Sequence, residues 1–306
     1  MATILSSDPP AHRRYQMSIS TVGVVGLGNM GLGMAKSLVR AGFSVIGYDI
    51  SDARRAQVEA EGVRFLPLAE VLNGADALVF SLPFAKDVEA VVTAPGGLLS
   101  RSDRKVVVID TSTSDPGTTR RLATRLAETG HGLLDAPVSG GPSGAETGSL
   151  TMMIGGEAAD MELAQGVIAA LSAKAVHVGA SGAGNIAKLV NNMLVAAHLV
   201  TTGEALKLSE SAGLSAEEAL KVVNAATGRS AISEAMVPRW VIPATFDSGF
   251  SAGLMRKDLR LALELAAETG SPTPLCSRAG EIWEEARQGR IPDTADFTLM
   301  ADYRSK

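Results

Sequence analysis

The feature that most constrains this fold is the stretch VGVVGLGNMGLGMA, which joins a short apolar run to a helical one. Its glycines Gly26, Gly28 and Gly31 have the spacing of a turn that lets the backbone approach a bound pyrophosphate. The spacing alone is a weak signal, because the chain contains 32 glycines. Its place between a predicted strand and a predicted helix is far more specific, since the amino end of a helix directs N–H groups at phosphate.

An aspartate at the end of the next predicted strand, SVIGYDI, strengthens this interpretation. Asp49 is placed to accept hydrogen bonds from the ribose hydroxyls of a dinucleotide, and its charge would repel a 2′-phosphate. NAD is therefore expected as the cofactor, and NADP stays open because Arg54 and Arg55 lie close by. The predicted cofactor-binding residues of the glycine turn are Gly26, Leu27, Gly28, Asn29, Met30 and Gly31.

Short apolar runs alternate with helical stretches as far as about residue 180, a pattern typical of a parallel sheet covered on both faces. The predicted strands after the first two are ALVFSLP, KVVVIDTST, GLLDAPVS and LTMMIGG. Residues 19–180 are thus expected to form an α/β Rossmann domain with a mostly parallel, doubly wound sheet. Residues 181–306 read as an all-helical substrate and oligomerisation domain, joined to the first by a long helix. Residues 1–18 read as a flexible leader.

Composition and charge argue against nucleic-acid binding, a membrane-spanning segment and a metal site. A net charge of −5 without a basic face argues against a nucleic-acid partner. No apolar run is long enough to span a bilayer, so we expect a soluble protein. The four histidines are scattered without metal-binding spacing, and a single cysteine fits a cytoplasmic home. The apolar joining helix favours a homo-oligomer, because one copy would leave much of it exposed.

The joining helix carries a polar stripe. In GNIAKLVNNMLVAAHLV, the residues Asn185, Lys188 and Asn192 are three and four apart and so share one helix face. One interpretation is a lysine whose ammonium reaches the surface between the domains. The other is a lysine at the mouth of the nucleotide cleft, with a pKa set by its surroundings, that acts as general acid and base. Helix periodicity does not decide between them.

Four segments in order resemble the β-hydroxyacid dehydrogenases, a family that includes 3-hydroxyisobutyrate dehydrogenase, tartronate semialdehyde reductase and L-threonate dehydrogenase. They are GLGNMGLGMAKSL, DAPVSGGPSGAETGSLTMMIGG, GAGNIAKLVNNMLVAAHLVTTGEAL and MRKDLRLALE. The resemblance runs from about Thr21 to about Asp296. It implies an NAD(P)-dependent oxidoreductase that acts on a small hydroxy acid or the matching semialdehyde. It identifies the superfamily but not the member.

The resemblance also implies roles for individual residues. Lys188 matches the lysine that takes the hydroxyl proton as hydride leaves, and Asn192 matches an asparagine that orients the substrate. Lys257 matches a lysine that closes over cofactor and substrate, and Asp258 is expected to orient or pair with it. Asp87 departs from the asparagine that relatives often carry, so it is left outside the site. The remaining matches are Ser139, Gly140 and Gly141 for the substrate carboxylate, Leu82 and Pro83 along the cofactor, and Thr113 near the nicotinamide ribose.

Two other functions stay open. Imine reductases share this two-domain plan but usually replace the lysine, and a non-catalytic dinucleotide-binding module would be expected to have lost Lys188 or the serine–glycine turn. The member of the family is not readable either. In the segment 224–240, expected to line the pocket, Ser230 and Ser233 favour a polyhydroxylated acid, whereas Met236 and Trp240 favour a methyl group. Either a homodimer or a homotetramer is expected.

Overall fold

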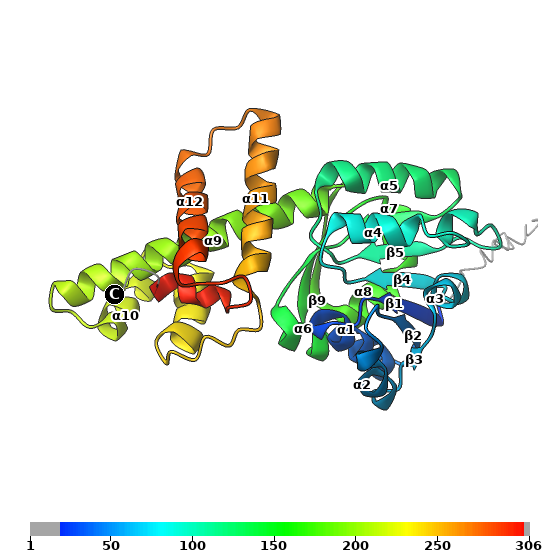
Figure 1. Ribbon diagram of the computed structural model, residues 1–306, viewed down its shortest axis with the longest axis horizontal. Helices are drawn as coiled ribbons and strands as arrows, with labels where there is room; N and C mark the ends of the chain where they lie inside the picture. The colour runs from blue at the N-terminus through cyan, green and yellow to red at the C-terminus, as the bar shows by residue number, and fades with distance from the viewer. Residues whose placement is uncertain (1–18, 303–306) are drawn as a thin grey trace, which may run out of the picture.

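The chain has two parts (Figure 1), here in a computed structural model that describes residues 19–302. A sheet with helices on both faces forms one part, and a cluster of helices forms the other. The long helix α9 (Ala183–Ser211) runs from the first part into the second. This arrangement confirms the predicted α/β domain followed by an all-helical domain. The predicted leader, residues 1–18, lies outside the described residues.

The strand order of the sheet reverses at one point, between β1 and β4. Its order is β3-β2-β1-β4-β5-β6-β8-β7, with β9 also paired to β8. The first six strands in this order are parallel, β8 runs antiparallel to β6 and β7, and β9 is parallel to β8. The chain order reverses between β1 and β4, which is where open α/β sheets bind ligands at the carboxyl ends of their strands. The strands are β1 (Thr21–Val25), β2 (Ser44–Tyr48), β3 (Arg64–Phe65), β4 (Ala77–Phe80), β5 (Val107–Asp110), β6 (Gly132–Asp135), β7 (Val138–Ser139), β8 (Leu150–Gly155) and β9 (Ser172–Gly179).

Apolar clusters cover both faces of this sheet, which explains why its strands read as continuous apolar runs. In β4, for example, Val79 packs into the cluster with α1, and Phe80 packs into the opposite cluster with α5. The helical segments of this domain are α1 (Asn29–Arg40), η1 (Asp52–Arg54), α2 (Arg55–Ala60), α3 (Leu68–Gly74), α4 (Ala85–Val92), η2 (Leu98–Ser100), α5 (Pro116–Glu128), α6 (Gly141–Thr147), α7 (Ala158–Leu163) and α8 (Gln165–Leu171).

The connection after β2 is organised by a carboxylate of the strand end. No side-chain capping bond forms at Ser51, the residue before the helical segment. Instead the N–H of Ser51 donates to the carboxylate of Asp49 at 2.8 Å, and Asp52 pairs with Arg55. The Asp49 carboxylate therefore organises this turn, so α2 starts only at Arg55, after a short 3₁₀ turn.

The helical domain packs around the far part of α9. Trp283, fully buried in the core of this domain, donates its indole N–H to the carbonyl of Ala196 on α9 at 3.2 Å. This contact joins α12 to the long helix. The other helical segments are α10 (Ala216–Ala225), the π-helix η3 (Ile232–Val241), α11 (Ala252–Thr269), α12 (Pro274–Gly289) and η4 (Phe297–Asp302).

Helix α9 is only partly covered by the rest of the chain. Its polar residues Asn185, Lys188 and Asn192 are buried, whereas its apolar residues Val190 and Leu194 are nearly half exposed. Within a single copy of the chain, neighbouring segments therefore cover only part of the circumference of this helix. Within residues 19–302, no helix combines the length and apolar character needed to cross a membrane.

Candidate active site

The glycine turn has the shape that its spacing predicts. Gly26 has φ +88°, and a Cβ there would overlap the carbonyl oxygen of Ser81. A Cβ on Gly31 would overlap the carbonyl oxygen of Gly26, so both positions require glycine. Gly28 differs, because nothing lies within 4 Å of the position its Cβ would take. Gly26 and Gly31 therefore allow the backbone to pack closely in the turn. The space beside Gly28, at the amino end of α1, is open, and a pyrophosphate would fit there.

Asp49 holds the second strand to this turn. Its Oδ2 accepts the N–H of Leu27 at 2.7 Å, and its Oδ1 accepts the N–H of Ser51. A carboxylate has further lone pairs, so these bonds leave it able to accept from ribose hydroxyls. Leu27 itself is fully buried, and Asn29 and Met30 open α1 beside Gly28. The residues predicted around the cofactor turn therefore lie together.

Two further loops leave the same edge of the sheet after β4 and β5. The N–H of Leu82 donates to the hydroxyl of Ser112 at 2.9 Å, which ties one loop to the other. The ammonium of Lys257 on α11 donates to the carbonyls of Pro83, at 3.2 Å, and Thr113, at 2.9 Å. The structure thus brings the predicted residues Leu82, Pro83, Thr113 and Lys257 into one cluster, in which a lysine of the helical domain bridges both loops of the sheet domain.

The serine–glycine turn lies between β7 and α6. Gly140 has φ +129° and Gly141 φ +64°, a conformation that L side chains rarely adopt, so the turn depends on glycine. The helical domain reaches this turn as well. A Cβ on Gly249 would lie 3.2 Å from the ring of Pro142, the residue that follows the turn. The binding of a carboxylate by Ser139 and the two glycines stays a prediction.

Lys188 is buried near the start of α9, with only 9% of its surface exposed. Burial lowers the pKa of its ammonium below the usual 10.5; the negative charge of Asp258 opposes this, and the positive charge of Lys257 adds to it. Within residues 19–302 its ammonium has no hydrogen-bond partner. The lysine therefore does not reach the surface as the first interpretation of the polar stripe requires, and its role as general acid and base stays a prediction.

Asp258 contacts Lys257 and Asn192, and its charge acts on Lys188. Its Oδ2 accepts the side-chain N–H of Asn192 at 2.6 Å, and its Oδ1 lies 3.2 Å from the ammonium of Lys257. The sequence prediction gave Asp258 only a supporting role toward Lys257 and missed that its charge raises the pKa of Lys188. A signal was present, because Met255 and Ala262 are three residues before and four after Asp258 and place it on the buried face of α11.

Two carboxylates lie side by side at the ends of β5 and β6. Asp110 and Asp135 are register partners in these neighbouring parallel strands. Asp135 accepts the N–H groups of Gly182 at 2.8 Å and Asn185 at 2.9 Å, which fixes the start of α9, where Asn185 lies less than one turn before Lys188. Burial raises the pKa of Asp135, and these bonds lower it. Burial also raises the pKa of Asp110 to about 7, with Asp135 adding to the rise.

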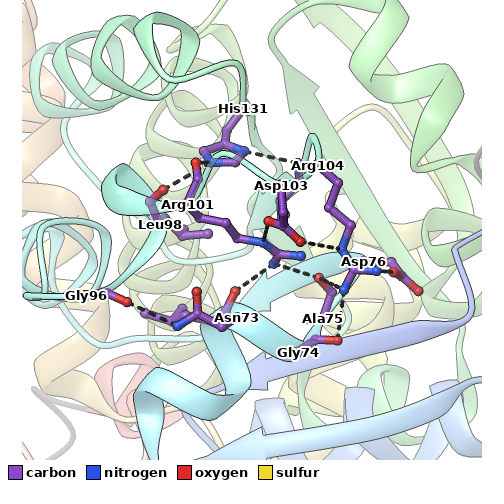
Figure 2. Close-up of polar contacts among 12 residues, drawn as sticks. Asn73, Gly74, Ala75, Asp76, Gly96, Leu98, Arg101, Asp103, Arg104 and His131 are labelled. Carbon is purple, nitrogen blue, oxygen red and sulfur yellow. Dashed lines mark hydrogen bonds and ion pairs between the residues drawn. The ribbon is translucent and has the colours of Figure 1, made fainter.

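Another polar cluster, shown in Figure 2, lies at the amino ends of the strands, away from the candidate site. Arg101 donates to the carbonyls of Leu72 and Ala75 at 2.8 and 2.9 Å and pairs with Asp103. His131 accepts the N–H of Val106, the residue before β5 begins. These bonds fasten the loop before β5 at the amino ends of the strands. The cluster therefore stabilises the sheet and is no part of the candidate site.

Family models match almost the whole described chain. Residues 21–179 match the NAD binding domain of 6-phosphogluconate dehydrogenase. Residues 182–303 match the model described as NAD-binding of NADP-dependent 3-hydroxyisobutyrate dehydrogenase. The two matches meet between β9 and α9, at the junction of the two parts of the fold.

Known proteins agree with these models. The 2-(hydroxymethyl)glutarate dehydrogenase of Eubacterium barkeri is 38% identical, over 87% of this chain and 89% of the relative. One similar structure is that of 3-hydroxyisobutyrate dehydrogenase from Mycobacterium tuberculosis with L-serine. It has a TM-score of 0.84 at 33% identity, and the match covers 92% of this chain and 98% of the chain in that structure. An imine reductase of Streptomyces aurantiacus has a TM-score of 0.62 at 17% identity, covering 94% and 99%, which shows a shared fold alone.

Proposed function

The chain belongs to the β-hydroxyacid dehydrogenase family of NAD(P)-dependent oxidoreductases, and from this premise we propose its substrate class and the roles of its site residues. It transfers hydride between a small hydroxy-carboxylic acid, similar to 3-hydroxyisobutyrate, and the dinucleotide. Lys188 is the general acid and base. The observation that carries this proposal is the buried ammonium of Lys188, with a lowered pKa and with Lys257 and Asp258 facing it.

The surroundings of Lys188 suit proton transfer in both directions. Burial favours its neutral amine, which is the form that can take the hydroxyl proton of an alcohol. The carboxylate of Asp258 favours the ammonium that results, so the proton is held rather than lost. When bound, the nicotinamide accepts hydride from the alcohol carbon or donates it to the carbonyl. In reduction, the Lys188 ammonium returns the proton to the carbonyl oxygen.

Substrate orientation falls to two groups. Asn192 lies four residues after Lys188 on the same face of α9, and the bond to Asp258 fixes its amide. Ser139, Gly140 and Gly141 bind the substrate carboxylate through a hydroxyl and backbone N–H groups. The two positive φ angles support this role, because successive amides in such a turn converge on an anion.

We assign NAD as the preferred dinucleotide. Asp49 places a negative charge at the end of β2, where it would repel a 2′-phosphate. Arg55, which would otherwise favour NADP, is already engaged, because it pairs with Asp52 and lies 4.4 Å above the ring of Phe65. Comparing the initial rates with NAD and NADP at equal concentrations tests this assignment, and a preference for NADP would contradict it.

Ser230 and Ser233 do not support the polyhydroxylated substrate that their presence in the sequence suggested. Ser233 is fully buried, its hydroxyl accepts the N–H of Ser230 at 2.8 Å, and the hydroxyl of Ser230 accepts the N–H of Ser233 at 3.2 Å. These serines satisfy each other at the start of η3 and do not favour a polyhydroxylated acid. An acid with an apolar substituent is therefore the proposed substrate.

The experiment is dinucleotide reduction at 340 nm against 3-hydroxyisobutyrate, L-serine, D-glycerate and L-threonate. We expect the highest kcat/KM with 3-hydroxyisobutyrate and NAD. Highest activity with L-threonate would contradict the substrate assignment. Absence of turnover with every acid, combined with reduction of a cyclic imine by NADPH, would replace the proposal by imine reduction.

We also propose that the protein is a homodimer or homotetramer in the cytoplasm. Val190 and Leu194 lie one turn apart on α9 and are 47% and 46% exposed, an apolar stripe that a second copy would cover. Light scattering coupled to gel filtration tests the assembly, and a monomer at micromolar concentration would contradict it. A single cysteine supports the cytoplasm, and imaging of a fluorescent fusion tests this.

A further inference from the structure

A chain of hydrogen bonds starts at the buried end of β5 and reaches the loop after β4. The N–H of Ser112 donates to Oδ1 of Asp110 at 3.0 Å, and the nearby Ser112 hydroxyl lowers the pKa of this carboxyl group. The same hydroxyl oxygen accepts the N–H of Leu82 at 2.9 Å. Because that oxygen accepts the Leu82 N–H, the single proton of the hydroxyl is free to turn toward the Asp110 carboxyl group. Asp110 is thereby joined through Ser112 to the Leu82 amide.

This chain lies beside the glycine turn. Phe80 and Asp110 are register partners in β4 and β5, so the two loops leave the sheet at the same level. The Leu82 side chain lies 3.0 Å from the position that a Cβ on Gly26 would take, which puts it against the glycine turn. A shift of Leu82 would therefore change the surface on which the dinucleotide binds.

The chain also determines what Lys257 can reach. The two carbonyls that accept its ammonium belong to Pro83 and Thr113, each one residue beyond the Leu82–Ser112 bond. Because that bond fixes the distance between the loops, one ammonium can contact both carbonyls. The helical domain is thus attached to the sheet domain through a pair of loops whose spacing is set from the end of β5.

Asp110 reduces the stability of the fold in this position. The residue is 2% exposed, and its burial and the neighbouring Asp135 both raise the pKa of its carboxyl group to about 7. Ser112 and the charge of Lys257 oppose this rise. A buried carboxylate is seldom the most stable choice at a site, and perturbed groups of this kind gather where function needs them.

We propose that Asp110 and Ser112 are positioning residues for the dinucleotide: they hold the Leu82–Pro83 loop and Thr113 in the spacing that lets Lys257 bridge them. Neither residue is a catalytic residue, since both act through the loops. Because the effect is on dinucleotide binding, it is measured without turnover, and its failure is distinguishable from failure of the proposed hydroxy-acid reaction.

The test uses Ser112→Ala with Ser114→Ala as the matched control. Ser114 lies in the same loop and is buried, but its hydroxyl has no hydrogen-bond partner within the described residues. The same substitution there removes a hydroxyl without breaking the chain. Affinity for NADH is measured by fluorescence titration, and exchange of the Leu82 amide by hydrogen–deuterium exchange.

We expect the Kd for NADH to rise about five- to thirtyfold in Ser112→Ala, the effect of losing one hydrogen bond and leaving a partly buried amide unpaired. Exchange of the Leu82 amide should accelerate in the same variant, and both quantities should stay unchanged in Ser114→Ala. A Kd and a Leu82 exchange rate in Ser112→Ala equal to those of the control would overturn the proposal.

Asp110→Asn is the second variant, on which NADH affinity is measured if Ser112→Ala does not fold. The asparagine keeps an acceptor for the Ser112 N–H but removes the charge that orients the hydroxyl. We expect a rise in the NADH Kd of about threefold or more, for loss of a charge-assisted bond. An unchanged Kd in Asp110→Asn would contradict the role of the carboxylate.

Discussion

Replacing Asp110 by asparagine should make the protein more stable, and by more at high pH than at low pH. The pKa of the carboxyl group rises from 3.8 to about 7 in the folded chain. Between these values the folded state holds a proton that the unfolded state has released, so the stability of the natural protein falls as pH rises through this window. At about 1.4 kcal/mol per pKa unit, the full penalty is about 4 kcal/mol, of which about 2–3 kcal/mol accumulates between pH 5 and pH 8.

The asparagine variant lacks this titration, and the other ionisable groups are common to both proteins. The assay is urea denaturation of the two proteins at pH 5, 6, 7 and 8, with the difference in unfolding free energy plotted against pH. We expect the advantage of Asp110→Asn to grow steadily with pH and to level off above pH 7 to 8. A difference that stays constant over this range, or shrinks as pH rises, would refute the reasoning.

Three further predictions concern the rest of the site. Asp258→Asn should move the ascending limb of the pH profile for alcohol oxidation to lower pH, because Asp258 raises the pKa of Lys188; a shift to higher pH would contradict the charge assignment. Asp135→Ala should lower the unfolding free energy by about 2–5 kcal/mol, since two buried N–H groups at the start of α9 lose their acceptor; thermal and urea denaturation measure this. Gly28→Ala should keep the melting temperature but weaken NADH binding, whereas Gly31→Ala should disrupt the fold, because Gly31, unlike Gly28, has no space for a Cβ. Equal melting temperatures for the two variants would contradict this account of the turn.

Much of this fold follows from local sequence. The central strands β1, β4, β5 and β6 are buried on both faces, so they appear as apolar runs that can be recognised from the sequence. The glycine turn was predictable because the positive φ of Gly26 and the close approach of Gly31 to the Gly26 carbonyl both arise within one strand–turn–helix unit. The polar stripe of Lys188 and its neighbours follows from the helix period alone.

The rest depends on contacts between distant segments. The two-residue strand β3 and the exposed strand β9 carry little pattern of their own and exist through pairing with β2 and β8. Asp258 faces Lys188 only because α11 packs against α9, a contact between residues 70 positions apart. Ser112 looks like an ordinary loop serine until the neighbouring loop brings the Leu82 amide to it.

The proposed proton transfer by Lys188 is tested most directly by comparing Lys188→Ala with Lys207→Ala. Both lysines belong to α9, but Lys207 is half exposed and pairs with Glu210, far along the helix from the candidate site. With saturating hydroxy acid and NAD, kcat of Lys188→Ala should fall by about 10²- to 10⁴-fold, while NADH binding and the kcat of Lys207→Ala stay unchanged. A kcat for Lys188→Ala within a few-fold of that of Lys207→Ala would show that another group moves the proton.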